Sequence, residues 1–105
     1  MKVIKYQAKR IEDELNDADE YIDKALEAKE SDPQTASLYY ELSAEEMGHV
    51  DKLHNDVVRH INEYKQENAE IPKEVEAMMG FYNFLHEQHI AKAMRIKVKQ
   101  AMFNS

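Results

Sequence analysis

The sequence predicts an all-α protein of long antiparallel helices joined by short turns. Only two of the 105 residues are glycine and two are proline, whereas glutamate, lysine, alanine, leucine and methionine, which favour helices, are abundant. Apolar residues recur every three or four positions along three segments, which is the spacing of one helix face. The length suits a single domain, residues 1–105, near the small end of chains that bury a sizeable core, so association with further copies would help it.

The net charge and the amino-acid composition narrow the classes of partner and site that the chain could have. The formal net charge of −7 argues against nucleic acid as a partner, because general nucleic-acid-binding proteins present a basic face to phosphates, and it is compatible with attracting cations. No run of about 18 apolar residues occurs, so we expect no membrane partner. The absence of cysteine excludes a disulfide framework and a thiolate metal site, and it permits a cytoplasmic location.

The first helix is predicted over about residues 3–30. The carboxylate of Glu14 interrupts its apolar seam, whereas the other acidic residues nearby fall mostly off the seam and are expected to form a solvated face. Between residues 12 and 30 there are nine acidic residues against two lysines, so the acidity of the chain is local. The seam itself consists of Ile4, Gln7, Ile11, Glu14, Ala18, Tyr21, Ala25 and Ala28.

The second helix is predicted over about residues 33–67, after a short turn that makes it an antiparallel neighbour of the first. Asp32 can cap this helix, and Pro33 suits its first turn. Glu46 and His49 are three residues apart, so they lie one turn apart on one face and can bind a single metal ion. They belong to a stripe that we predict to be buried, made of Leu38, Leu42, Glu46, His49, Leu53, Val57, Ile61 and Tyr64.

The third helix is predicted over about residues 72–103. Its core seam is Val75, Met78, Tyr82, Leu85, His89, Ala93 and Ile96. The helix is apolar over more than one face, which favours an oligomer interface, and the apolar residues that widen it are Met78, Met79, Phe81, Phe84, Met94 and Met102. From Ile90 onward the segment is basic without any acid, so it can meet the acidic first helix.

The polar residues in the first two seams lie at one height along the bundle. Glu14 lies 15 residues before Lys29, whereas Glu46 and His49 lie 14 and 17 residues after Asp32. With a rise of about 1.5 Å per residue, all three are roughly 21–26 Å from the turn, so we predict that they meet. A buried carboxylate needs a cation or several donors, which favours a metal site. The alternative is a partly exposed glutamate beside a hydrogen-bonded core histidine.

One chain supplies only two carboxylates and one imidazole to this site. A two-fold partner doubles the set to four glutamates and two histidines, which is the constellation of carboxylate-bridged dinuclear sites in four-helix bundles. We therefore predict a homodimer or a larger homo-oligomer, with Glu14, Glu46 and His49 as the metal ligands. Oxygen and nitrogen ligands without sulfur suit iron, two ions per dimer, or manganese, with zinc as a substitute.

The other histidines give weaker signals. His54 and His60 are expected to be ordinary packing or surface residues. His89 counts to nearly the same height as His49 if the second and third helices are antiparallel, so it could support the site or replace a ligand. We favour a core histidine, because the four-glutamate, two-histidine set is complete without it. His86 and His89 do not form a zinc-protease motif, because the second histidine would have to stand at Ile90.

Two segments together resemble the ferritin-like di-iron superfamily, most closely the encapsulated ferritins and the rubrerythrin-like half-ferritins. They are Asp13-Glu14-Leu15 with Asp19-Glu20-Tyr21, and, about thirty residues later, Ala44-Glu45-Glu46-Met47-Gly48-His49. The resemblance covers roughly residues 10–65. It implies that Glu14, Glu46 and His49 bind iron across a dimer interface. The sequence departs from encapsulated ferritins in its long third helix and in a C-terminus, residues 101–105, without an evident shell-targeting peptide, so an encapsulating shell as a partner lacks support there.

From these observations we expect a ferritin-like four-helix bundle completed by dimerisation, with dinuclear iron and ferroxidase-type chemistry that oxidises Fe(II) with dioxygen. The alternative from another class is a metal-free helical scaffold or interaction protein, in which Glu14, Glu46 and His49 form a buried polar network that fixes the register between chains. Metal content distinguishes the two hypotheses.

Overall fold

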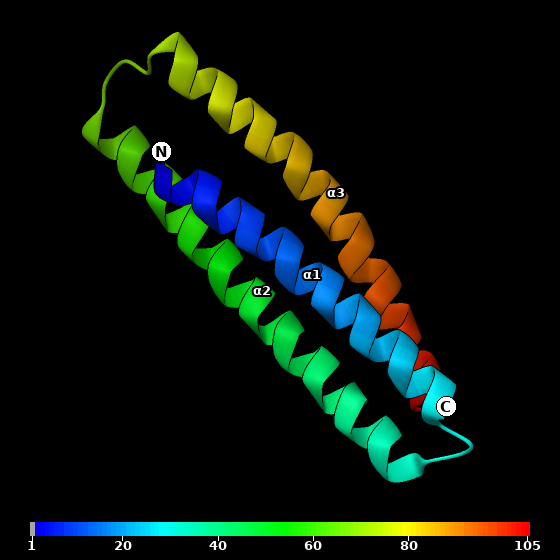
Figure 1. Ribbon diagram of the computed structural model, residues 1–105. Helices are drawn as coiled ribbons and strands as arrows, with labels where there is room; N and C mark the ends of the chain where they lie inside the picture. Colours follow the sequence, from blue (N-terminus) through cyan, green and yellow to red (C-terminus); the bar gives the residue numbers. More distant parts are fainter. Residues whose placement is uncertain (1) are drawn as a thin grey trace.

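The computed structural model describes residues 2–105, and in that range it contains three long helices and no strand. Helix α1 spans Lys2–Ala28, α2 spans Pro33–Glu67 and α3 spans Lys73–Phe103. In Figure 1, α1 and α2 run antiparallel side by side, and α3 returns along α1. The described part of the chain is a rod of 58 × 19 × 17 Å. The predicted all-α class is confirmed, and each helix ends within two residues of its predicted bounds.

The turn between α1 and α2 is fixed by the cap that the sequence predicts. The backbone N–H of Thr35 donates to Asp32 Oδ1 at 3.3 Å, and its hydroxyl donates to Oδ2 at 2.7 Å. These two bonds lower the pKa of Asp32. Pro33 occupies the first turn of α2, where its missing N–H costs nothing. Pro72, the first residue of the range predicted for the third helix, stands just before α3 as the cap residue.

The core lies along α1. Ile11, Leu15 and Ile22 of α1 are fully buried, together with Val57 of α2 and Ile96 of α3. Burying such a side chain stabilises the fold by about 1.5–3 kcal/mol relative to leaving it in water. Because all three helices contribute to this core through α1, the first helix positions the other two.

Helix α3 is held to α1 by the charges that the sequence predicts to meet. Lys99 Nζ lies 2.9 Å from a carboxylate oxygen of Asp19 and 2.9 Å from one of Asp23, and these bonds raise the pKa of Lys99. Lys92 Nζ donates to the side-chain oxygen of Asn16. The basic second half of α3 therefore lies against the acidic face of α1, as expected.

One buried hydroxyl joins all three helices. Ser43 Oγ of α2 donates to the carbonyl oxygen of Ala18 in α1 at 2.8 Å, and it accepts from Nε2 of Gln100 in α3 at 3.1 Å. Nearby, the rings of Tyr40 and Phe103 stack with their centroids 4.9 Å apart. Most of the hydrogen bonds that α3 makes with α1 and α2 thus lie in its C-terminal half.

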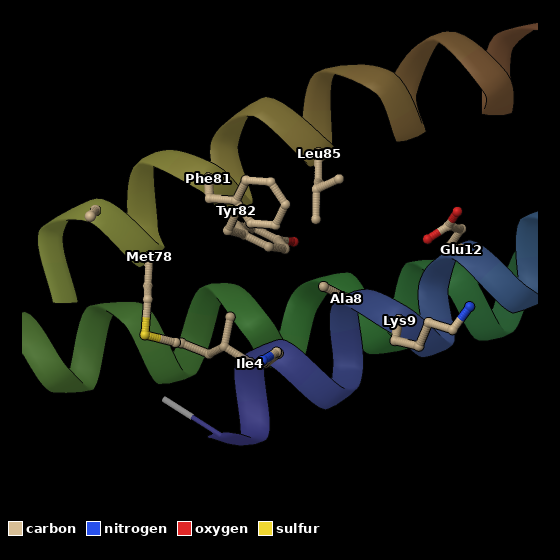
Figure 2. Close-up of a pocket in the computed structure, with 10 residues that line it drawn as sticks. Ile4, Ala8, Lys9, Glu12, Met78, Phe81, Tyr82 and Leu85 are labelled. Atoms are coloured by element: carbon tan, nitrogen blue, oxygen red, sulfur yellow. The ribbon is translucent and has the colours of Figure 1, made fainter. Parts of the chain in front are cut away.

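The first half of α3 leaves an open groove of about 580 Å³ against α1. Figure 2 shows Met78 extending from α3 toward Ile4 of α1, with Tyr82 and Leu85 further along and Glu12 at one end. The side chain of Met79 is buried, whereas several other apolar residues of α3 are exposed, namely Met78, Phe81, Phe84, Ile90, Met94, Val98 and Met102. The prediction that α3 is apolar over more than one face is therefore confirmed.

Within residues 2–105, none of the helices combines the length and the apolar character that crossing a membrane requires.

Candidate metal centre

Glu14 of α1 is a buried carboxylate with two neighbours. Its residue is 8% exposed, and Oε1 accepts a hydrogen bond from Arg10 Nη2 at 2.6 Å, one turn earlier in the same helix. The second oxygen, Oε2, lies 3.5 Å from Nδ1 of His49 in α2. The buried charge is thus neutralised on one side by a guanidinium and directed on the other toward the second helix. Arg10 was not predicted from the sequence.

Glu46 and His49 complete the cluster from α2. The distance from His49 Nδ1 to Glu46 Oε2 is 3.7 Å, and one ligand atom from each of Glu14, Glu46 and His49 lies within 4.8 Å of the other two. The structure therefore brings the three residues together at one level of the α1–α2 pair, where the helical rise places them.

The donor set fits a metal ion on two grounds. Ligand atoms that share one ion at about 2.0–2.2 Å lie roughly 3–4 Å from each other, which the two distances from His49 Nδ1 match. In addition, Glu46 Oε2 is buried and has no hydrogen-bond partner among residues 2–105. Buried polar atoms are normally paired, so an unpaired carboxylate oxygen beside two other possible ligand residues is compatible with cation binding at this cluster.

The cluster opens on the face of the molecule opposite α3. Glu12 lies beside His89 in the cleft under α3, and Asn16 binds Lys92 of α3. Glu14 is two residues from each, which is a rotation of about 200° around the helix, so its side chain points the other way. The His49 side chain is 53% exposed on that open face. No helix of the described chain covers this side of the cluster.

The predicted buried stripe of α2 is wrong in its first half. Leu38 is 52% exposed and His49 is also exposed, whereas the residues of α2 that are buried are Ala36, Ser43, Met47, Val50 and Val57. The reason is that α1 packs on a neighbouring flank of α2. The row that contains Leu38 and His49 instead forms the rim of the α1–α2 pair, with Glu46 between rim and core.

His89 lies apart from the cluster. It is buried at the α1–α3 contact, where Nδ1 has no hydrogen-bond partner in the described chain. Burial lowers its pKa, and the nearby Glu12 carboxylate partly opposes this shift. The predicted height of His89 along the bundle therefore did not indicate which side of α1 it would face. The structure does not bring it to Glu14.

A second histidine group was missed by the sequence analysis. The rings of His54 and His86 stack with centroids 4.3 Å apart and an interplanar angle of 2°, and His54 Nδ1 lies 3.2 Å from the hydroxyl oxygen of Tyr82. Burial, and then the charge of His86, lower the pKa of His54. His60 is ordinary, as expected, with Nε2 3.2 Å from Asp56.

Comparison of the chain with protein-family models, with curated proteins and with solved structures finds no match. What the site binds is therefore inferred from the residues themselves.

Proposed function

We propose that this chain is a ferritin-like iron-binding protein that oxidises ferrous iron with dioxygen at a dinuclear site shared by two copies. The observation that supports this most directly is the unpaired, buried oxygen of Glu46 beside Glu14 and His49. Two copies related by a two-fold axis would contribute four glutamates and two histidines, the ligand set of dinuclear sites in four-helix bundles.

Ferrous iron is the substrate, and each ion gives one electron to dioxygen. The chain contributes carboxylates that offset the ion's charge and an imidazole that adds a nitrogen donor, a combination that suits iron and manganese and also accepts zinc. His49 stands at the exposed rim and Glu14 at the buried end, so an ion would enter past His49. Arg10 already holds Glu14 Oε1, so binding would loosen or displace this pair.

Iron stoichiometry tests the proposal. Protein reconstituted with Fe(II) under anaerobic conditions and freed of unbound metal should contain about one iron per chain, because two chains share two ions. Glu46→Gln and His49→Ala should each lose most of this iron, whereas Glu45→Gln, one position away on an exposed part of α2, should retain it. Admission of oxygen should then consume dioxygen and form ferric iron in the parent protein and in Glu45→Gln, but not in Glu46→Gln or His49→Ala. Absence of iron from the parent would refute the proposal.

The second candidate is a metal-free scaffold whose polar cluster fixes the register between chains. The 2.6 Å pair between Arg10 and Glu14 favours it, because this pair already neutralises one of the two carboxylates. Arg10→Gln separates the hypotheses. In a scaffold it would leave Glu14 buried without its cation and destabilise the chain by about 1–3 kcal/mol under all conditions. At a metal site, saturating metal should recover this loss, and urea unfolding with and without metal measures both.

A further inference from the structure

The outward side of α3 carries a second row of apolar and small residues, separate from the row that packs on α1. The packed row repeats every seven residues at Tyr82, His89 and Ile96, all of which are buried. The outward row also repeats every seven residues, with members three or four positions apart that are all exposed and all apolar or small except Glu87: Gly80, Phe84, Glu87, Ala91, Met94, Val98 and Ala101. A seven-residue apolar repeat sustained along a helix is the pattern of a seam between two helices.

Gly80 has no explanation within the chain. It stands inside α3, where glycine costs roughly 1 kcal/mol relative to alanine, and a Cβ atom built on it would meet nothing within 4 Å in the described chain. Nothing in the described chain requires a glycine at this position of α3. A glycine on the outward row therefore indicates that something outside the chain comes close to the helix there.

The exposed charges of α3 are divided between its two halves. Glu74, Glu76 and Glu87 lie in the first half together with one base, Lys73, whereas Arg95 and Lys97 lie in the second half, which contains no acid. Two such helices side by side would set like charges against each other when parallel and opposite charges when antiparallel. The charge pattern is therefore complementary to a reversed copy of itself.

We propose that the outward row of α3 is an interface that binds α3 of a second copy of this chain in antiparallel orientation. When the outward rows of the two copies are aligned along their whole length, Phe84 of one copy faces Met94 of the second copy. This is a favourable contact between an aromatic ring and sulfur. Val98 faces Gly80 of the second copy and occupies the room that this glycine leaves. The one charged residue in the row, Glu87, faces the small Ala91 near the two-fold axis, where its carboxylate can reach solvent.

This interface is independent of the proposed metal site. The outward row lies opposite the buried row that packs on α1, although its member Ala91 borders the cleft between α1 and α3, whereas Glu14, Glu46 and His49 open on the side of α1 and α2 that is opposite α3. The α3 pair should consequently form in the presence of a metal chelator. If iron never binds, the α3 interface still stands. Conversely, if chelated protein is monomeric, the α3 proposal fails while the iron proposal is untouched.

Cross-linking tests the orientation directly, because the chain contains no cysteine. Ala77 and Ala101 are both exposed, and they extend the outward row to its two ends; Ala77 also borders the groove against α1. In the antiparallel register each faces the other residue of the second copy, and like positions are about 36 Å apart. A mixture of Ala77→Cys and Ala101→Cys proteins, oxidised in chelator, should form a disulfide-linked dimer, whereas each protein alone should not. Cross-linking of each variant with itself would overturn the antiparallel arrangement, and no cross-link in any sample would overturn the interface.

Association in solution tests the seam. Phe84→Glu should raise the dissociation constant of the chelated dimer at least about 30-fold, because it buries an unpaired charge at the centre of the contact. Asn83→Glu adds the same charge one position away, off the outward row, and should leave the dimer nearly unchanged. Phe84 and Asn83 are both exposed in the single chain, so circular dichroism should show the helices intact in both variants. Equal dissociation constants in sedimentation equilibrium would refute the proposed seam.

Discussion

Glu46→Gln should stabilise the metal-free chain and destabilise it relative to the parent when metal is present. Oε2 of Glu46 is buried without a partner, and an unpaired buried polar atom costs about 1–3 kcal/mol. A carboxylate oxygen of Glu14 lies within 4.8 Å of a carboxylate oxygen of Glu46. Two like charges at that separation repel by about 3.5 kcal/mol at an effective dielectric constant near 20. Because Arg10 and solvent at the rim offset part of this repulsion, we expect a net gain of about 1–2 kcal/mol from the neutral amide.

Metal should reverse the order of the two proteins. At a free metal concentration about 100 times the dissociation constant, binding stabilises the parent by about 2.7 kcal/mol, and the variant, lacking a ligand, gains little. In chelator the melting temperature of the variant should be higher by roughly 4–8 °C for each kcal/mol gained. Differential scanning calorimetry with chelator and with Mn²⁺ or Zn²⁺ measures both states.

The exposed neighbour provides the control. Glu45→Gln should change the stability by less than about 0.5 kcal/mol in either state, because surface substitutions seldom do more. If Glu46→Gln were less stable than the parent in chelator, the Glu46 carboxylate would be making a favourable contact in the metal-free chain. In that case the cluster would not be a ligand site that destabilises the metal-free chain.

Two further predictions concern stability. Burial lowers the pKa values of His54 and His89, so the folded chain binds fewer protons than the unfolded chain as the pH falls below the usual histidine value of 6.5. The free energy of unfolding, measured in urea, should therefore be highest above pH 6.5 and should decline below it. This decline should be shallower in His54→Gln than in the parent. An equal decline in the two proteins would mean that other groups take up the protons. Gly48 stands in the interior of α2 with nothing within 4 Å of a built Cβ, so Gly48→Ala should stabilise the single chain by about 0.5–1 kcal/mol; a loss of stability in urea unfolding would mean that a neighbour approaches there.

The helices and the meeting of the cluster residues could be predicted because both depend on local periodicity. Asp32 and Pro33 fix one end of α2, and a constant rise per residue then determines which positions of α1 and α2 share a height. Glu14, Glu46 and His49 come together for this reason. The helix bounds followed from the same signals, to within two residues.

The direction in which a side chain points was harder to predict than its height. His89 lies under α3 on the far side of α1, because the sequence gives position along a helix but not which flank of α1 the third helix covers. The same ambiguity misplaced Leu38 and His49, since α2 has apolar residues on two flanks and only one of them faces α1.

Polar side chains that act inside the fold were also missed. Ser43 looks like a surface residue by type, yet it belongs to the true buried row of α2, seven residues from Ala36 and from Val50. That spacing was the available signal. Arg10 gave none beyond its position one turn before Glu14, because a basic residue four positions from an acidic one is common on exposed helix faces.

The way in which α3 is attached has a consequence for the folding pathway. Two of its polar contacts, from Lys99 to Asp19 and from Gln100 to Ser43, are near the end farthest from the linker that connects it to α2. The partners of these bonds are 80 and 57 positions apart in the sequence, whereas α1 and α2 meet across a short turn. Closing a long loop costs conformational entropy before the contacts between its ends can form. We therefore expect the α1–α2 hairpin to form first and α3 to dock late, from its C-terminal end backward.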